Sequence, residues 1–409
     1  MDKRSDHIKN ILHGFFLSIG TTIAEPSTIL PLIVHAFGGG SILVGLFAAL
    51  LRGGAIIVQL FAAFQAQSYE RMLPYLRRVF LIRFFAWFGI GVAIILFGES
   101  HPDVTLFFIG LGLFIFSFSA GFGAIYFKEI IAKIFTHKFR GKSMAYRQFF
   151  TAFGGLISGS LAALILEVFE PPLSFGYLFM ISAFLMGFGY LAFSSVDEPL
   201  KTEVARRENS FKRFLRNALD TLKSDKELQV QVSTFLLAYA YLIALPFIIL
   251  DAQSKIELSA AAIGILITTQ MVGAMLSNII WGRLSGSGKN RRTANLAIGM
   301  HLLAIAAAFG ADTLYEYMFI FFLVGAAADG NRIASGNLIL ILAPPPKRPL
   351  YIALQMNIVS MGMFFSIAGG LILHISSYEI LYAITSLVLL LAFLLSLRLK
   401  DERESQLRE

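Results

Sequence analysis

Twelve apolar runs of about 20 residues each dominate this 409-residue chain and constrain its fold more than any other feature. A run of this length is what an α-helix needs to cross the hydrocarbon core of a membrane. The sequence therefore predicts an all-α integral membrane protein. Its spans are expected roughly at 11–36, 41–65, 79–97, 104–127, 143–167, 174–195, 229–250, 259–282, 294–311, 316–342, 350–375 and 378–398.

The composition excludes a water-soluble protein. Hydrophobic residues make up 56% of the chain and charged residues only 15%, whereas about a quarter of the residues of a soluble domain are charged. The absence of cysteine excludes a disulfide framework and a thiolate metal site. The first apolar run follows a short polar segment and no small-residue cleavage site follows it, so we expect a retained span and not a signal peptide.

The positive charges predict the direction in which the chain crosses the membrane, because cytoplasmic loops are enriched in Lys and Arg. With the N-terminus in the cytoplasm, Lys255 is the one basic residue in an outside loop. Arg52, Arg83, Arg147 and Arg332 fall within or at the ends of spans, and all the others of the 34 basic residues are cytoplasmic. An even number of spans places both termini in the cytoplasm. The net charge of +8 therefore reflects membrane topology and not a nucleic-acid partner.

The longest polar stretch divides the chain in its middle. It predicts an N-terminal six-helix bundle over 1–196, a cytoplasmic linker over 197–228 and a C-terminal six-helix bundle over 229–409. Apolar residues of the linker recur at helical spacing beside a basic face, which is typical of an amphipathic helix on a lipid surface. We expect this stretch to act as a plain linker between the two halves, and a lipid-regulated switch is the alternative. The apolar positions are Phe211, Phe214, Leu215, Leu219 and Leu222, and the basic ones are Arg206, Arg207, Lys212, Arg213 and Arg216.

Three segments of the first half recur in the second. Residues 149–157 of the fifth run match residues 364–372 of the eleventh, 215 positions later. Such matches in the same order indicate duplication of a six-helix unit. Because six is even, the two units run in the same direction, and parallel repeats place a site near the membrane midplane between them. The shorter matches are Gly54-Ala55 with Gly273-Ala274, and Pro31 with Pro246.

The first run carries an acid at membrane depth, because Glu25 lies near its middle and Pro26 follows it. A carboxylate inside a bilayer is costly and is expected to face protein or water. Proline also leaves a backbone carbonyl without its amide partner. The sequence indicates a cavity-lining helix with a protonatable or ligand-binding acid, or else a structural carboxyl bound by a neighbouring helix. On a continuous helix the same face would hold Ser18, Thr21, Thr22 and Thr28.

Arg52, halfway along the second run, is the expected partner of Glu25. A guanidinium stays charged at any accessible pH, and consecutive spans are antiparallel neighbours. A permanent pair would hold Glu25 ionised and make it a poor proton carrier. A pair that separates would leave a desolvated carboxyl, and desolvation favours the protonated form. We adopt the separable pair as the hypothesis.

Asp329 and Arg332 repeat this pattern in the tenth run, one helical turn apart. Residues 329–332 alone would pass for a turn, but the apolar pieces on either side are too short to cross separately. We therefore expect one interrupted helix. The pair either neutralises itself or places Arg332 on a substrate anion and Asp329 on a coupling proton. Further candidates at membrane depth are Ser117, Tyr239, Tyr241, Gln270, Asn278, His301, Gln355 and Asn357.

Six plus six spans, a long basic central loop and cytoplasmic termini resemble the major facilitator superfamily of secondary transporters, over essentially the whole chain. In that family a Gly-x-x-x-Asp-Arg-x-Gly-Arg-Arg motif follows the second helix. Residues 67–71 and 77–78 stand in a similar place without the glycines, and residues 282–292 are closer but lack the acid. The resemblance implies a cytoplasmic gate at Glu70, Arg71, Arg147 and Arg283.

The resemblance implies alternating-access transport of a small organic solute. Carboxylates at depth favour proton coupling, and arginines at depth favour an anionic or zwitterionic solute. No metal-ligand spacing or phosphate loop is present, so we expect no enzyme and no cofactor. The protein is expected to act as a monomer in the plasma or inner membrane. The alternatives are a non-transporting receptor or scaffold, and a drug-efflux antiporter. Efflux is weakened because no proline precedes Gly154-Gly155 and the fourth run lacks Arg.

Overall fold

The computed structural model describes residues 3–23, 25, 27–66, 69–135, 137–200, 219–344 and 348–401, which form helices joined by short connections, with no strand among them. The predicted amphipathic helix of the linker lies mostly outside the described residues. Its end, residues 219–224, is helical.

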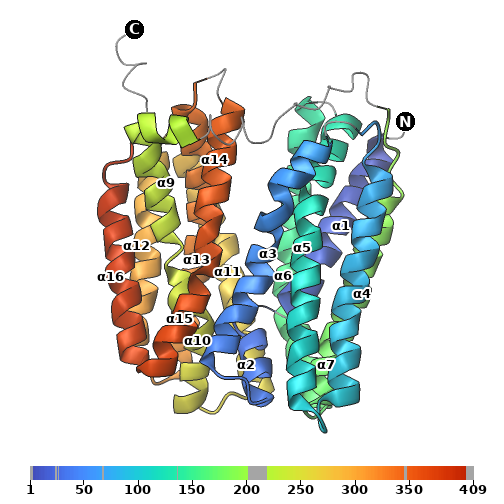
Figure 1. Cartoon of the computed structure of the whole chain (residues 1–409), viewed down its shortest axis with the longest axis vertical. Helices are drawn as coiled ribbons and strands as arrows, with labels where there is room; N and C mark the ends of the chain where they lie inside the picture. The colour runs from blue at the N-terminus through green and yellow to red at the C-terminus, as the bar shows by residue number, and fades with distance from the viewer. Residues whose placement is uncertain are drawn as a thin grey trace. The chain divides into compact units, whose positions relative to one another are not determined.

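The helices form two compact units (Figure 1). The first lies within Met1–Glu208 and includes Leu258–Thr268, and the second comprises Asn209–Glu257 and Thr269–Glu409. The helices before the linker are α1 (Lys3–Ile23), α2 (Ile29–Ala36), α3 (Ser41–Ala66), α4 (Leu73–Phe97), α5 (Pro102–Ile134), α6 (His137–Val168) and α7 (Leu173–Ser194). Those after it are α9 (Lys226–Ala238), α10 (Tyr241–Lys255), α11 (Ala260–Gly286), α12 (Asn290–Ala308), α13 (Leu314–Leu342), α14 (Arg348–Ser360), the short 3₁₀ helix η2 (Met361–Phe364), α15 (Phe365–Ile375) and α16 (Tyr378–Ser396).

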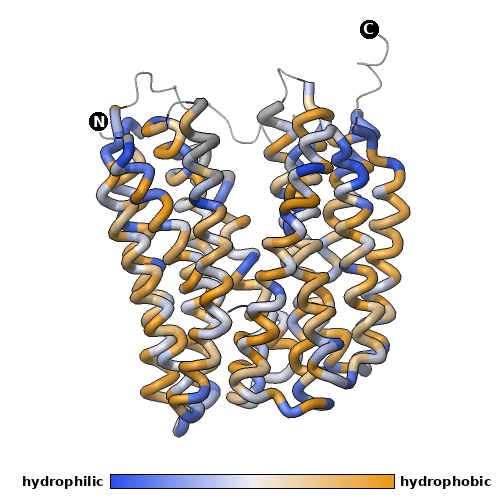
Figure 2. Tube along the Cα trace, turned by 180° about the vertical axis from the view of Figure 1, so that it is seen from behind, coloured by the Kyte–Doolittle hydropathy of each residue, from blue (hydrophilic) through white to orange (hydrophobic). Residues whose placement is uncertain are grey.

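Each of the twelve predicted spans contains one or more of these helices. By length and composition, 8 helical stretches of the described residues can cross a membrane: α4, α5, the part of α6 from Tyr146, α7, α9 with α10, α11, Leu354–Ile375 and α16. The other four runs form α1 with α2, α3, α12 and α13. Figure 2 shows hydrophobic residues along the helices of each unit and hydrophilic residues mainly at the helix ends. The predicted all-α membrane fold is confirmed.

The two units pair their helices in the same way. In the first, α1 packs on α6 and α7, α4 packs on α5 and α7, and α3 packs on α5. In the second, α10 packs on α15 and α16, α12 packs on α13 and α16, and Trp281 of α11 donates to the carbonyl of Ala326 in α13 at 2.9 Å. When the helices are numbered as spans one to six and seven to twelve, each of these helix pairs in the first unit corresponds to a pair six spans later in the second unit. The structure therefore supports duplication of a six-helix unit.

Glycine allows close helix contact at matching places in the two units. A Cβ atom at Gly154 of α6 would lie 2.7 Å from the carbonyl oxygen of Phe15 in α1. One at Gly369 of α15 would overlap the carbonyl oxygen of Ile243 in α10. These are the glycines that the sequence repeat matched. Phe15 and Ile243 lie 228 positions apart and the two glycines 215, so the offset between the halves varies along the chain, as the sequence matches with offsets of 215 and 219 also indicate.

Interruptions occur in the first, seventh and eleventh spans. The first is divided into α1 and α2, the seventh into α9 and α10, and the eleventh by η2. The predicted interruption of the tenth span is wrong, because α13 runs without a break from Leu314 to Leu342. The polar residues at its centre bond to side chains within their own unit, as described below, and therefore need no opening in the backbone.

Candidate functional site

The first span opens at Glu25. Helix α1 ends at Ile23 and α2 begins at Ile29. Pro26 has no amide hydrogen to continue the helical ladder, and the carbonyl of Thr22 instead accepts from the amide of Glu25 at 3.2 Å. The expected continuous polar face from Ser18 to Thr28 is therefore wrong beyond Ile23, because Glu25 lies between two helices.

Glu25 is surrounded by backbone and hydroxyl groups at this opening. Its carbonyl accepts from the amides of Thr28, Ile29 and Leu30 at 3.1, 3.1 and 3.3 Å. The hydroxyl of Ser27 donates to Glu25 Oε1 at 3.2 Å. The hydroxyl of Thr28 is buried and has no hydrogen-bond partner among the described residues. One buried hydroxyl without a hydrogen-bond partner thus lies at the break in the helix, and such breaks are where transporter ligands are commonly bound.

Arg52 and Glu25 form the expected ion pair. Arg52 Nη2 lies 2.8 Å from Glu25 Oε1, and the side chains are 25% and 15% exposed. The guanidinium is carried by α3 at a close crossing with α5. A Cβ atom at Gly54 would lie 3.0 Å from the side chain of Ser117, whose hydroxyl accepts from the Ala55 amide at 3.2 Å. This contact fixes the segment of α3 that carries Arg52.

A pocket in the second unit collects several predicted site residues. Its walls come from α9, α10, α13 and α14. Tyr241, Arg332 and Gln355 all line it, and so does Asn331, which the sequence analysis did not select as a site residue. Other polar lining groups are Tyr239, Ser335 and Ser360. The structure therefore brings together residues of the seventh, tenth and eleventh spans around one space.

The walls of this pocket are fixed by polar contacts. The rings of Tyr241 and His301 stack with centroids 3.9 Å apart, and His301 Nδ1 lies 3.1 Å from the amide nitrogen of Asn331. Gln355 donates to the carbonyl and the hydroxyl of Ser335 at 2.9 and 2.7 Å. Asn331 Oδ1 is buried without a hydrogen-bond partner among the described residues. The pocket is thus lined by the aromatic ring of Tyr241 and by Asn331, whose Oδ1 can accept a hydrogen bond.

Asp329 lies beside this pocket in a three-residue cluster. It accepts from Arg332 at 2.7 Å and from the side-chain amide of Asn278 in α11 at 2.7 Å. The Arg332 side chain is 68% exposed and that of Asp329 is 18% exposed. Asp329 is therefore held in place by two donors, while much of the guanidinium stays accessible. Gln270, buried in α11, does not line the pocket.

The residues expected at a cytoplasmic gate have different surroundings. Glu70, Arg71 and Arg283 are exposed, and none of them forms an ion pair with another described residue. Arg147 instead points into the first unit, where its guanidinium lies 5.0 Å from the ring centre of Phe127 and 3.4 Å from His13 Nδ1. Within the described part of the first unit, Arg147 forms no ion pair with Glu70.

Three buried carboxylates among the described residues escaped the sequence analysis: Asp6, Glu198 and Asp251. Glu198 accepts from the amides of Met72 and Leu73 and from Lys133 Nζ at 2.6 Å. Asp251, on α10 of the second unit, pairs with Lys255 Nζ at 3.3 Å. Each is an acid beside a run of apolar residues, and that position was the only signal in the sequence.

Comparison with known proteins identifies the fold. No curated protein matches the chain by sequence. Residues 230–409 match the sequence profile of the Major Facilitator Superfamily. The crystal structure of the nucleoside transporter NupG aligns with a TM-score of 0.76 at 12% identity, covering 96% of this chain and 99% of that chain. The chain has the major facilitator fold.

Other solved structures with the major facilitator fold agree. A D-xylose–proton symporter aligns with a TM-score of 0.69 at 14% identity, covering 99% of this chain and 98% of that chain. A bacterial homologue of the iron transporter ferroportin aligns with a TM-score of 0.70 at 11% identity, covering 97% and 99%. The resemblance drawn from the sequence is confirmed. The fold and the apolar helices indicate a multi-pass membrane protein.

Proposed function

We propose that this protein is a proton-coupled secondary transporter for a small organic solute with an anionic or zwitterionic group. The observation that carries the proposal is the part-buried ion pair between Glu25 and Arg52 at the opening of the first span. Both side chains keep some exposure, so a proton and an anion can reach them. An acid at membrane depth is by default a functional group.

The pair provides a simple means of coupling. When Glu25 binds a proton, it no longer neutralises Arg52, and the guanidinium needs another anion because it remains charged. A carboxylate or phosphate of the solute can take that place. Loss of the proton restores the pair and weakens the hold on the solute. Proton binding and anion binding then favour each other, as linkage requires.

The pocket of the second unit supports the solute class. Arg332 offers an accessible cation, Tyr241 an aromatic face, and Asn331 Oδ1 an unused acceptor. These groups suit a solute that combines an anionic group, a hydrogen-bond donor and a planar or apolar portion. We propose that Asp329 holds Arg332 in position. We further propose that Gln355 and Asn278 support the pocket, that Gln270 lies on the pathway, and that Glu70, Arg71, Arg147 and Arg283 act in gating.

The proposal extends to the cellular setting. We place the protein in the plasma or inner membrane as a monomer, with both termini in the cytoplasm, on the basis of the charge distribution. The solute and the protons are its partners, and the linker over 197–228 would lie on the cytoplasmic side of the bilayer.

A thermal-shift screen of sugars, nucleosides, amino acids and organic acids would first identify a ligand. Transport of that ligand by the purified protein reconstituted in liposomes then tests the proposal. Wild-type protein should exchange the solute in counterflow and accumulate it under an imposed proton gradient. Glu25→Gln, which fixes the neutral state, should keep counterflow and lose accumulation. Glu167→Gln changes an exposed acid at the end of α6 and should keep both.

Two outcomes would contradict the proposal. Binding without counterflow for every ligand would indicate a receptor or scaffold. Accumulation by Glu25→Gln at the wild-type rate would remove Glu25 from the proton pathway and would leave Asp329 as the remaining acid of the proposed pathway.

A further inference from the structure

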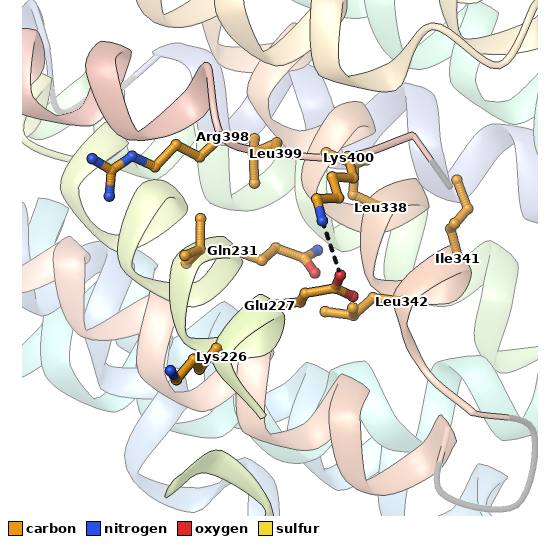
Figure 3. Close-up of a pocket in the computed structure, with 10 residues that line it drawn as sticks. Lys226, Glu227, Gln231, Leu338, Ile341, Leu342, Arg398, Leu399 and Lys400 are labelled. Carbon is orange, nitrogen blue, oxygen red and sulfur yellow. Dashed lines mark hydrogen bonds and ion pairs between the residues drawn. The ribbon is translucent and has the colours of Figure 1, made fainter. Parts of the chain in front are cut away.

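A second pocket of the second unit lies outside the proposed solute pathway. It is formed by the beginning of α9, the end of α13 and the residues that follow α16 (Figure 3). One wall is apolar and consists of Val230, Leu338, Ile341, Leu342 and Leu399. These helix ends are the ones at which the sequence places the cytoplasm, so the pocket lies at the level of the cytoplasmic lipid headgroups.

Gln231 supplies a hydrogen-bond donor to this pocket. The residue is only 3% exposed, and its Nε2 atom has no hydrogen-bond partner among the described residues. Figure 3 shows its amide pointing into the space between Glu227, Lys400 and Leu338. A buried donor without a partner is destabilising, so a ligand oxygen at this place would remove the penalty.

The charged residues around the pocket favour an anion. Lys226, Arg398 and Lys400 contribute three cations against the single carboxylate of Glu227. Lys400 Nζ and Glu227 Oε1 are 3.5 Å apart, which is longer than the roughly 2.7–2.9 Å of a strong charge-assisted hydrogen bond. The Lys400 ammonium carries three N–H donors, so it can bond a phosphate oxygen in addition to its protein partners. The excess of positive charge and the free amide donor suit a phosphate group.

We propose that this pocket binds an anionic phospholipid. The phosphate would accept hydrogen bonds from Gln231 and Lys400, with Arg398 and Lys226 adding positive charge at the rim. An acyl chain would lie along Leu338, Ile341 and Leu342. Basic pockets between membrane helices on the cytoplasmic side are suited to such headgroups. The binding would attach the end of α16 to α9 and α13 and would stabilise the second unit.

The experiment uses the full chain in nanodiscs of phosphatidylcholine alone or mixed equally with phosphatidylglycerol. Thermal unfolding and native mass spectrometry of retained lipid measure binding. Phosphatidylglycerol should raise the Tm and be retained preferentially. Gln231→Leu and Arg398→Gln should each weaken this preference roughly tenfold. Arg292→Gln removes an exposed cation at the same end but outside the pocket and should leave it unchanged.

The outcomes separate a lipid site from other sources of phosphate or charge. Gln231→Leu should unfold at or above the wild-type temperature in phosphatidylcholine, which shows that it folds. Retention of phosphatidylglycerol by this variant at the wild-type level would overturn the proposal. An equal loss in Arg292→Gln would show general attraction to a basic surface. An equal rise in Tm with inorganic phosphate would identify a soluble anion as the ligand instead of a lipid.

Discussion

The carboxylate of Asp251 on α10 accepts a hydrogen bond from the hydroxyl of Tyr382 on α16, with 3.0 Å between the two oxygens. The same carboxylate oxygen accepts from Tyr317 of α13 at 3.1 Å. Asp251, Tyr317 and Tyr382 are 2%, 0% and 1% exposed. A single buried oxygen therefore connects three helices of the second unit, and Lys255 supplies the balancing charge.

Asp251→Asn should lower the free energy of unfolding by about 2 kcal/mol, because it removes the charge that pairs with Lys255 and weakens two hydrogen bonds. Tyr382→Phe should lower it by about 1 kcal/mol, the usual net value of one hydrogen bond. Tyr315→Phe is the control, since Tyr315 on α13 is 80% exposed. Thermal unfolding in detergent measures all three. Equal stability of Asp251→Asn and wild type would contradict the assignment.

Arg52→Gln should destabilise the first unit by about 2 kcal/mol, because it leaves the part-buried Glu25 carboxylate without its partner. Glu25→Gln combined with Arg52→Gln should recover most of this loss, since neither side chain then carries a charge. A double-mutant cycle of unfolding free energies measures the coupling of the pair. Strictly additive losses would show that the ion pair contributes no coupling free energy.

Arg332→Gln should weaken binding of an anionic solute about tenfold or more. The unfolding temperature should hardly change, because exposed ion pairs are worth about 0–1 kcal/mol. Thermal shift or calorimetric titration with the ligand from the screen gives the affinity. A neutral analogue of the same solute serves as the control, and its affinity should not depend on Arg332. Equal losses for both compounds would place Arg332 in a structural role.

Two glycines of α13 should respond in opposite ways to alanine. At Gly325 the added carbon would overlap the carbonyl oxygen of Gln270, so Gly325→Ala should cost about 1–3 kcal/mol. At Gly336 nothing lies within 4 Å, and Gly336→Ala should keep or raise stability because alanine is the better helix former. Thermal unfolding of both variants and of the wild type under the same conditions measures these changes in stability. A stable Gly325→Ala would contradict the close crossing of α11 and α13.

Labelling of single cysteines checks the predicted orientation, and the absence of native cysteine simplifies the experiment. Glu257→Cys should react with an impermeant thiol reagent added to intact cells, and Lys289→Cys should react only after the membrane is opened. Both positions are exposed. Labelling of position 289 from outside would reverse the topology.

Much of the fold follows from patterns that lie within single segments of the chain. Runs of about 20 apolar residues determine the spans, and the matched glycines on α6 and α15 show the duplication. The ion pair of Glu25 with Arg52 could be predicted because consecutive spans are neighbours. Contacts between spans that are not consecutive could not be predicted in this way, because chain order does not tell which of them are neighbours.

The features that escaped prediction depend on contacts between distant segments. The carboxylate of Glu198 caps amides near Met72, and Asp251 meets tyrosines of two later spans. No spacing within one segment marks either contact. At the centre of α13 the sequence pattern favoured a turn, but Asn278 and His301 supply side-chain partners there and the helix continues.

The carbonyl of Glu25 accepts from residues three, four and five positions ahead at nearly equal distances. These are the spacings of a 3₁₀, an α and a π helix. The first turn of α2 can therefore tighten or unwind by one residue while this carbonyl keeps a donor throughout. One residue corresponds to a rotation of about 100°. The Glu25 carbonyl oxygen is therefore a pivot about which α2 can turn. The same residue pairs with Arg52 through its side chain.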